Sequence, residues 1–221
     1  PASGLHITSN RAGRLLLRLT GIPNELQQED SFYTVLGYLI GRTADNRIPV
    51  VEGMTGKPDE DQLKGLAATA ASSGAVRMFH ILGVTPEALT LEAAFQGRHP
   101  EETLDITMDD LREARRDLTT ADGTQLDLVV LGSPHLSLAE IKRLLPLVVG
   151  KHLHPNIEFL VTTSRAVALL AEKSGAMQYL RDFGARVTVD TCILTTPMLS
   201  DDVKVLMTNA GKFAYYSPGL L

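Results

Sequence analysis

Apolar and polar positions alternate along the chain with the periods of helices and strands. Residues 31–42 carry apolar side chains near i, i+3, i+4 and i+7 spacing, which predicts a helix. Residues 59–75 predict a second helix, opened by acidic residues and closed by a glycine, and residues 11–20 also look helical. Short apolar runs at 47–52 and 76–82 predict strands on either side of the second helix, so this part of the chain is expected to form a β-α-β unit.

The last hundred residues give the clearest pattern. Runs rich in β-branched residues predict four strands, at 126–132, 157–163, 185–191 and 203–209. Helix patterns at 136–148 and 164–184 separate the first three of them, while a short strand over 102–108 and a charged helix over 108–118 are expected earlier. Such alternation is typical of parallel strands covered by helices on both faces. We therefore predict an α/β fold, a three-layer α/β/α domain with a mostly parallel sheet, as a single domain over residues 1–221 that can divide into sub-lobes 1–122 and 123–221.

Composition and charge narrow the classes of partner. The 221 residues are 44% apolar and 21% charged, and 21 basic against 26 acidic residues give a net charge of -5. This balance argues against binding to nucleic acid or to a membrane surface, so small molecules or proteins are the expected partners. A single cysteine, Cys192, excludes an intrachain disulfide framework, and the absence of a signal-peptide pattern then favours the cytoplasm.

Polar residues cluster just past the four predicted strands, where parallel sheets bind their ligands. They are Ser133 and His135 in an expected turn, Ser164 and Arg165, Thr191 and Cys192, and finally Tyr215 together with Asn209 and Lys212, which are expected in a glycine-containing turn. One interpretation is that the serines cap helices, that the cysteine is a buried apolar filler, and that Tyr215 and its neighbour plug the sheet edge. The other is that the groups of Ser133 with His135 and of Ser164 with Arg165 bind a carboxylate or phosphate. Earlier in the chain, His80 near a strand end and His6 join the candidates.

Five runs in order carry a resemblance to a known family. They are FYTVLGYLIGRTADNRIPVVEG (32–53), FHILGVTPEA (79–88), GSPHLSLAEI (132–141), VDTCILTTPM (189–198) and TNAGKFAYYSPG (208–219). Together they resemble the large-subunit region of the aconitase X family, over nearly the whole chain. The resemblance implies an aconitase-like fold, an iron–sulfur cluster, a small swivelling domain or subunit as partner, and hydro-lyase (dehydratase) activity. It also implies that the chain is a segment of a longer protein and is inactive in isolation.

The resemblance further implies roles for single residues. Cys192 is expected to be one cluster ligand, with its companions outside this segment, and Ser133 stands where some family members have a cysteine. Dehydration of a hydroxy acid requires proton transfer and stabilisation of a carboxylate, so the expected catalytic residues are His80, His135 and Lys212. The expected substrate-binding residues are His6, Ser133, Ser164, Arg165, Thr191, Asn209 and Tyr215.

Three functions stay open at this point. The sequence shows little basic clustering to suggest a phosphate, so cis-3-hydroxy-L-proline is the expected substrate. Mevalonate 5-phosphate, the substrate of other family members, is the alternative within the same enzyme class. A non-catalytic α/β assembly or regulatory domain is the third interpretation, in which the strand-end residues are only caps and turn formers.

Overall fold

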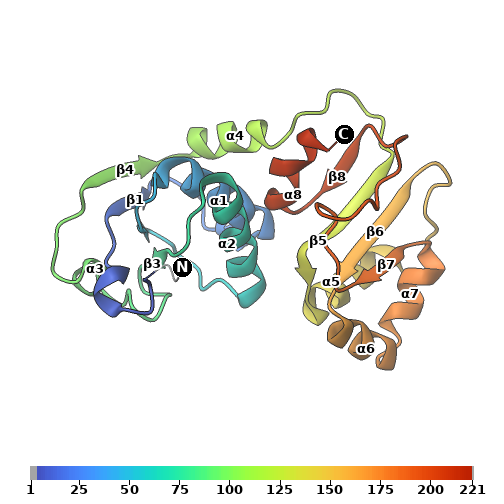
Figure 1. The fold of residues 1–221 in the computed structure, drawn as a ribbon, viewed down its shortest axis with the longest axis horizontal. Helices are drawn as coiled ribbons and strands as arrows, with labels where there is room; N and C mark the ends of the chain where they lie inside the picture. The colour runs from blue at the N-terminus through green and yellow to red at the C-terminus, as the bar shows by residue number, and fades with distance from the viewer. Residues whose placement is uncertain (1–3, 221) are drawn as a thin grey trace. The chain divides into compact units, whose positions relative to one another are not determined.

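The computed structural model of the chain describes residues 4–220 and divides into two compact units. The first unit ends at Leu118 and the second begins at Thr119. Each contains a four-stranded sheet in which every strand pair is parallel, flanked by helices (Figure 1). The predicted α/β class with parallel strands is therefore confirmed, although the strands form two sheets and not one.

The first unit has the strand order β3-β2-β1-β4. Its strands are β1 (Leu15–Leu19), β2 (Pro49–Glu52), β3 (His80–Ile81) and β4 (Glu102–Ile106), and its helices are α1 (Asp30–Ala44), α2 (Glu60–Gly74), α3 (Leu91–Phe95) and α4 (Met108–Asp117), with short 3-10 helices at Thr8–Arg11 and Leu26–Gln28. The helices expected over 31–42, 59–75 and 108–118 are thus confirmed as α1, α2 and α4. The strand expected over 76–82 is confirmed only as the two-residue β3.

The helix expected over residues 11–20 is wrong, because this segment contains the central strand β1. Leu15 and Leu17 belong to the core cluster that includes residues of α1 and α2, while Leu16 belongs to the cluster on the other face, with Phe95 of α3. A strand buried on both faces is apolar throughout, so periodicity cannot distinguish it from a buried helix. The run LLLRL lacks the polar alternation that would have identified it.

The second unit has the strand order β7-β6-β5-β8. Its strands are β5 (Leu128–Leu136), β6 (Glu158–Thr163), β7 (Arg186–Val189) and β8 (Leu206–Thr208), and its helices are α5 (Leu138–Val148), α6 (Arg165–Lys173), α7 (Ala176–Phe183) and α8 (Gly211–Tyr216), followed by a 3-10 turn at Ser217–Gly219. The four strands predicted for this part are confirmed, with ends that differ by a few residues.

Helices α5, α6 and α7 cover one face of this sheet, and a long loop together with α8 covers the other. Ile141 of α5 and Leu180 of α7 pack on Val161 in one core cluster. On the opposite face, Ile193 from the loop after β7 and Phe213 of α8 pack on the sheet in a second cluster. Each face of the sheet is thus buried, which explains why its strands read as continuous apolar runs.

Two local expectations in this unit differ from the structure. The helix pattern over 164–184 is broken into α6 and α7 at Gly175, whose φ of 78° is left-handed and interrupts a helix. The glycine-containing turn expected around Lys212 is instead the first turn of α8.

Among the described helices of either unit, none is long and apolar enough to cross a membrane.

Candidate functional site

The carboxyl ends of the second sheet gather most of the candidate residues at one edge. Thr163 at the end of β6 pairs with both Leu136 of β5 and Val189 of β7, so the segments that follow β6 and β7 leave the sheet at the same level. β8 ends at Thr208, which pairs with Val130, so Asn209 and the start of α8 follow at the same edge, beside the last residues of β5. Parallel pairing therefore brings four separate loops to one edge.

The end of β5 is irregular, and it holds two of the candidates. Ser133 and His135 were expected in a turn, but they lie within the extended β5, in the stretch between Leu131 and Leu136 where its register with β6 shifts. The shift begins at Gly132, which has a φ of 106° and approaches β6 so closely that a Cβ there would lie 2.1 Å from the carbonyl oxygen of Thr162. Thr162 Oγ1 donates a hydrogen bond of 2.5 Å to the carbonyl oxygen of Gly132. Only glycine fits this position.

His135 connects the end of β5 to the loop that carries the cysteine. Its Nε2 lies 2.7 Å from the carbonyl oxygen of Thr191, and because a carbonyl only accepts, the imidazole must donate. The half-buried His135 therefore holds in place the peptide group that joins Thr191 to Cys192. Ser137, two residues further along, caps α5 by accepting a hydrogen bond of 3.1 Å from the backbone N–H of Glu140.

Cys192 is a half-buried residue at the start of a tight turn. Its carbonyl oxygen accepts hydrogen bonds from Thr196 Oγ1 at 2.7 Å and from the backbone N–H of Thr195 at 3.1 Å. Among residues 4–220, no three His, Cys, Asp or Glu side chains lie close enough together to hold a metal ion. Iron–sulfur clusters are held by several cysteines, so the donor set described here fits one ligand position of such a cluster and no more.

Ser164 and Arg165 follow β6, and both have local partners. The Ser164 hydroxyl accepts a hydrogen bond of 3.2 Å from the backbone N–H of Val167, so it caps α6 as the simpler interpretation expected. Arg165 is 82% exposed, and its Nε lies 2.9 Å from Oδ2 of Asp190. The other oxygen of Asp190 accepts a hydrogen bond of 2.8 Å from the backbone N–H of Arg165.

Asp190 is a residue of this edge that the sequence analysis missed. It directly follows β7 and precedes Thr191, and its φ of 52° is unusual for a residue other than glycine. Its carboxylate ties the end of β7 to the start of α6 through Arg165. The available signal was its position past a strand end, which is the same criterion that selected its neighbours.

Lys212 is the cation at this edge that lacks a carboxylate partner. It is half-buried in the first turn of α8, and it makes no ion pair or side-chain hydrogen bond with any residue in the range 4–220. The next residue, Phe213, is fully buried in the same cluster as Ile193, which follows Cys192. The residues adjoining the lysine and the cysteine are therefore anchored in one shared core.

The two tyrosines of α8 do not plug the sheet. Tyr215 and Tyr216 are 37% and 42% exposed and stack edge to face with ring centroids 5.3 Å apart, whereas Phe213 is the buried aromatic residue. The interpretation in which both tyrosines fill the sheet edge is therefore wrong. Asn209, which precedes the helix, is exposed.

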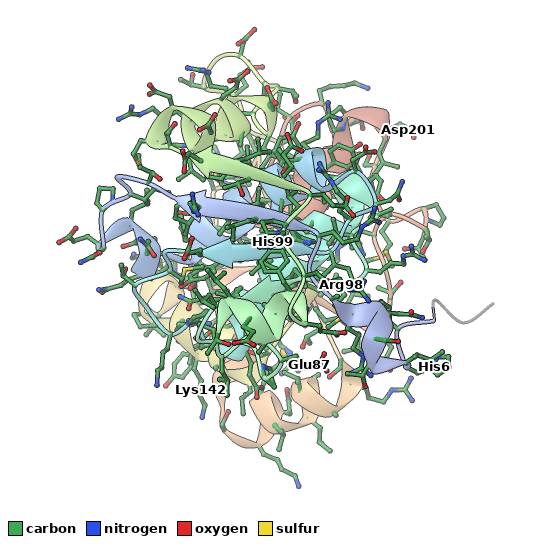
Figure 2. The ribbon with its side chains drawn as sticks, turned by 90° about the vertical axis from the view of Figure 1, so that its left-hand side faces the viewer. His6, Glu87, Arg98, His99, Lys142 and Asp201 are labelled. Atoms are coloured by element: carbon green, nitrogen blue, oxygen red, sulfur yellow. The ribbon has the colours of Figure 1, made fainter. Side chains whose placement is uncertain are left out.

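His80 and His6 belong to the first unit. His80 is 1% exposed within β3, and its Nε2 lies 2.7 Å from the carbonyl oxygen of Arg11. The Arg11 guanidinium in turn pairs with Glu87. His6 is exposed in the turn ahead of the first 3-10 helix, and its side chain points outward (Figure 2).

Comparison with known protein families covers both units. The family model described as "Aconitase X second domain" matches residues 13–116, and the model described as "Aconitase X third domain" matches residues 126–221. Among solved structures, the crystal structure of Thermococcus kodakaraensis aconitase X (holo-form) is similar with a TM-score of 0.83 and 28% identity, covering 99% of this chain and 54% of that one.

Curated relatives are similar along the full length of the chain. The cis-3-hydroxy-L-proline dehydratase of Pseudomonas aeruginosa is 41% identical over 224 aligned positions, and that of Hypocrea jecorina is 40% identical. The phosphomevalonate dehydratase large subunit of Methanothermobacter thermautotrophicus is 36% identical over 223 positions. Each alignment covers 100% of this chain but only 38%, 37% and 52% of the respective relatives, so the chain spans about half of their length or less.

Proposed function

The chain belongs to the aconitase X family, and from this premise we propose that the longer protein containing it is a hydro-lyase that dehydrates cis-3-hydroxy-L-proline. The observation that carries the proposal is the ranking of the relatives by sequence identity to the chain. Two cis-3-hydroxy-L-proline dehydratases are 41% and 40% identical to the chain, whereas five phosphomevalonate dehydratase large subunits are 28% to 36% identical. Phosphomevalonate dehydration is therefore the second candidate.

Dehydration of a hydroxy acid places two demands on the protein. A proton must leave the carbon beside the carboxylate, and hydroxide, a poor leaving group, must depart. An iron–sulfur cluster, when bound, supplies a Lewis-acidic iron that assists the departing hydroxyl. In our proposal Cys192 is one of its ligands, and the others come from outside residues 4–220.

In this proposal Lys212 binds the substrate carboxylate. The residue is half-buried and its ammonium group has no carboxylate partner within residues 4–220, so its charge is available to an anionic ligand. Arg165 is less suited, because Asp190 already accepts from its side chain and offsets its charge. Partial burial also strengthens a charge–charge interaction relative to one in open solvent.

His135 acts in this proposal as a positioning residue. By donating to the carbonyl oxygen of Thr191, it holds the backbone from which Cys192 projects. His80 is left out of the catalytic set, because its ring is buried and its Nε2 is already bonded to a backbone carbonyl. Ser133, Thr191, Asn209 and Tyr215 stay predictions for orienting hydrogen bonds to the substrate, and so does His6.

The active protein is proposed to include more than this chain. Several relatives are named as large subunits, which implies a small subunit for those proteins. We expect a small aconitase X domain or subunit to complete the site here, and the active protein to be cytoplasmic.

The test is turnover by the full-length protein, purified without oxygen. It is incubated separately with cis-3-hydroxy-L-proline, with the other hydroxyproline isomers and with mevalonate 5-phosphate, and products are identified by mass spectrometry. We expect loss of one water from cis-3-hydroxy-L-proline. Dehydration of mevalonate 5-phosphate alone would transfer the assignment to the second candidate, and turnover of none of these compounds would favour the non-catalytic interpretation.

A further inference from the structure

The first unit contains a pocket of about 390 Å³ at the amino-terminal edge of its sheet. Its polar lining includes Asn10, Arg14, Asn46, Arg47, Arg77 and Arg98, contributed by four separate segments. These segments are the residues before β1, the α1–β2 loop, the α2–β3 loop and the α3–β4 loop. The volume lies in the range of pockets that bind small molecules.

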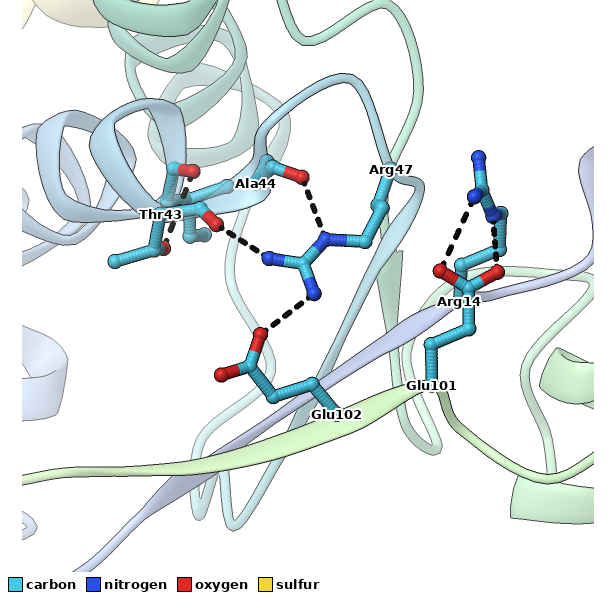
Figure 3. Close-up of polar contacts among 7 residues, drawn as sticks. Arg14, Thr43, Ala44, Arg47, Glu101 and Glu102 are labelled. Atoms are coloured by element: carbon cyan, nitrogen blue, oxygen red, sulfur yellow. Dashed lines mark hydrogen bonds and ion pairs between the residues drawn. The ribbon is translucent and has the colours of Figure 1, made fainter.

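Two of the four arginines are held in place by glutamates. Arg14 makes a two-pronged ion pair with Glu101, with N···O distances of 2.6 and 3.1 Å (Figure 3). The hydrogen bond from Arg14 lowers the pKa of the Glu101 carboxyl below its ordinary value. Arg47 lies 2.6 Å from Glu102, and it also donates to the carbonyl oxygens of Thr43 and Ala44 at 3.1 and 3.0 Å. Its side chain is only 15% exposed. Both guanidinium groups are thus preorganised.

The other two arginines have no such partners. The side chains of Arg77 and Arg98 are exposed and make no ion pair or hydrogen bond with any residue that the structure describes. Arg98 stands in the loop between α3 and β4, beside His99 (Figure 2). None of the described residues that line the pocket is acidic. The four positively charged guanidinium groups are therefore offset only by the two glutamates that pair with Arg14 and Arg47. A local positive surplus therefore exists in a chain whose net charge is -5.

We propose that this pocket binds a compact dianion, a phosphate or the phosphate group of a small monoester. Guanidinium groups match phosphate oxygens with paired N–H donors and stay charged at all physiological pH values. The amides of Asn10 and Asn46 add uncharged polar groups to the same lining. A tetrahedral dianion carries more charge and more acceptor oxygens than a single carboxylate, so it can accept from several of these donors at once. The proposal concerns the first unit only and does not depend on which hydroxy acid the protein dehydrates.

No sequence pattern indicates this pocket, since its arginines are spread from position 14 to position 98. Basic residues show little clustering along the chain, but these four arginines cluster in space. Parallel strands bring the residues that precede them to one edge, and the arginines meet there.

The test is calorimetric titration of the full-length protein with inorganic phosphate at constant ionic strength, with citrate and chloride as comparison anions. Arg77→Ala and Arg98→Ala each remove one unpaired guanidinium. Arg116→Ala is the matched control, because Arg116 is exposed in the last turn of α4 in the same unit and does not line the pocket. We expect saturable binding of phosphate that weakens about tenfold or more in each pocket variant, as for loss of a charge-assisted hydrogen bond, and that is unchanged in the control.

Three results would overturn the proposal. They are the absence of saturable phosphate binding to the unaltered protein, an equal weakening in Arg116→Ala, and tighter binding of citrate than of phosphate that depends on the same two arginines. Because binding is measured without a substrate, failure here leaves the proposed dehydratase activity untouched, and failure of the activity leaves the pocket untouched.

Discussion

At the scale of residues, the carboxyl edge of the second sheet is organised by hydrogen bonds to backbone groups. His135 donates to the carbonyl oxygen of Thr191, and Asp190 accepts from the backbone N–H of Arg165. Each of these contacts joins the end of one strand to the segment after another. The geometry of the loop that carries Cys192 therefore depends on side chains that need not touch the substrate.

The role of His135 can be tested by comparing two substitutions in the full-length protein. His135→Phe removes the donor to Thr191 while keeping an aromatic ring, and we expect the rate of dehydration to fall about tenfold, as for one lost hydrogen bond of 1–1.5 kcal/mol. His135→Gln restores an N–H donor and should recover part of that rate. If histidine served as the proton carrier itself, the glutamine variant would be as inactive as the phenylalanine variant, because an amide does not titrate.

At the scale of elements, the helix pair α1 and α2 shows how closely the first unit is packed. A Cβ built on Gly41 of α1 would lie 1.9 Å from Oγ of Ser73 and 2.9 Å from the carbonyl oxygen of Ala70, both in α2. Ser73 also donates to the carbonyl oxygen of Tyr38, which links the helices directly at 3.2 Å. The two helices therefore meet backbone to backbone at Gly41.

This contact predicts opposite effects for two glycine substitutions. Gly41→Ala should lower the free energy of local opening of α1 by about 1–3 kcal/mol, because overpacking against backbone exceeds the gain in helix propensity. Gly65→Ala in α2 is the matched control, since its Cβ would meet only Thr34 Oγ1 at 3.7 Å, and it should raise stability by about 0.5–1 kcal/mol. Hydrogen exchange of helix amides measures both values. Equal effects of the two substitutions would refute the tight crossing.

The sequence predicted elements well where amphipathic or alternating patterns were present. The helices α1, α2 and α4 and the four strands of the second unit were found, because a polar face or a clear flanking turn marked each of them. β1 was mistaken for a helix, since Leu15, Leu16 and Leu17 are all buried and leave no period to read. The length of β5 was missed, because its irregular end depends on the contact between Gly132 and Thr162, which no local pattern encodes.

At the scale of the whole molecule, parallel topology explains both the site and the pocket. Four loops reach the carboxyl edge of the second sheet, and the arginines reach the amino-terminal edge of the first. The loops at the carboxyl edge of the second sheet were predictable as a site, because ligand sites follow the carboxyl ends of strands. The partners of those residues were not predictable. Arg165 pairs with Asp190, and Lys212 has no carboxylate partner within residues 4–220, and both facts arise only from the folded arrangement.

The central claim is that the carboxyl edge of the second sheet binds the hydroxy acid that the full-length protein dehydrates. It is tested most directly by the kcat/KM for cis-3-hydroxy-L-proline of Lys212→Gln beside Lys151→Gln, an exposed lysine of the same unit without a side-chain partner among residues 4–220. Our account predicts a loss of at least about a hundredfold in Lys212→Gln, as for a desolvated charge pair, and no change in Lys151→Gln. Equal activity of the two variants would contradict it.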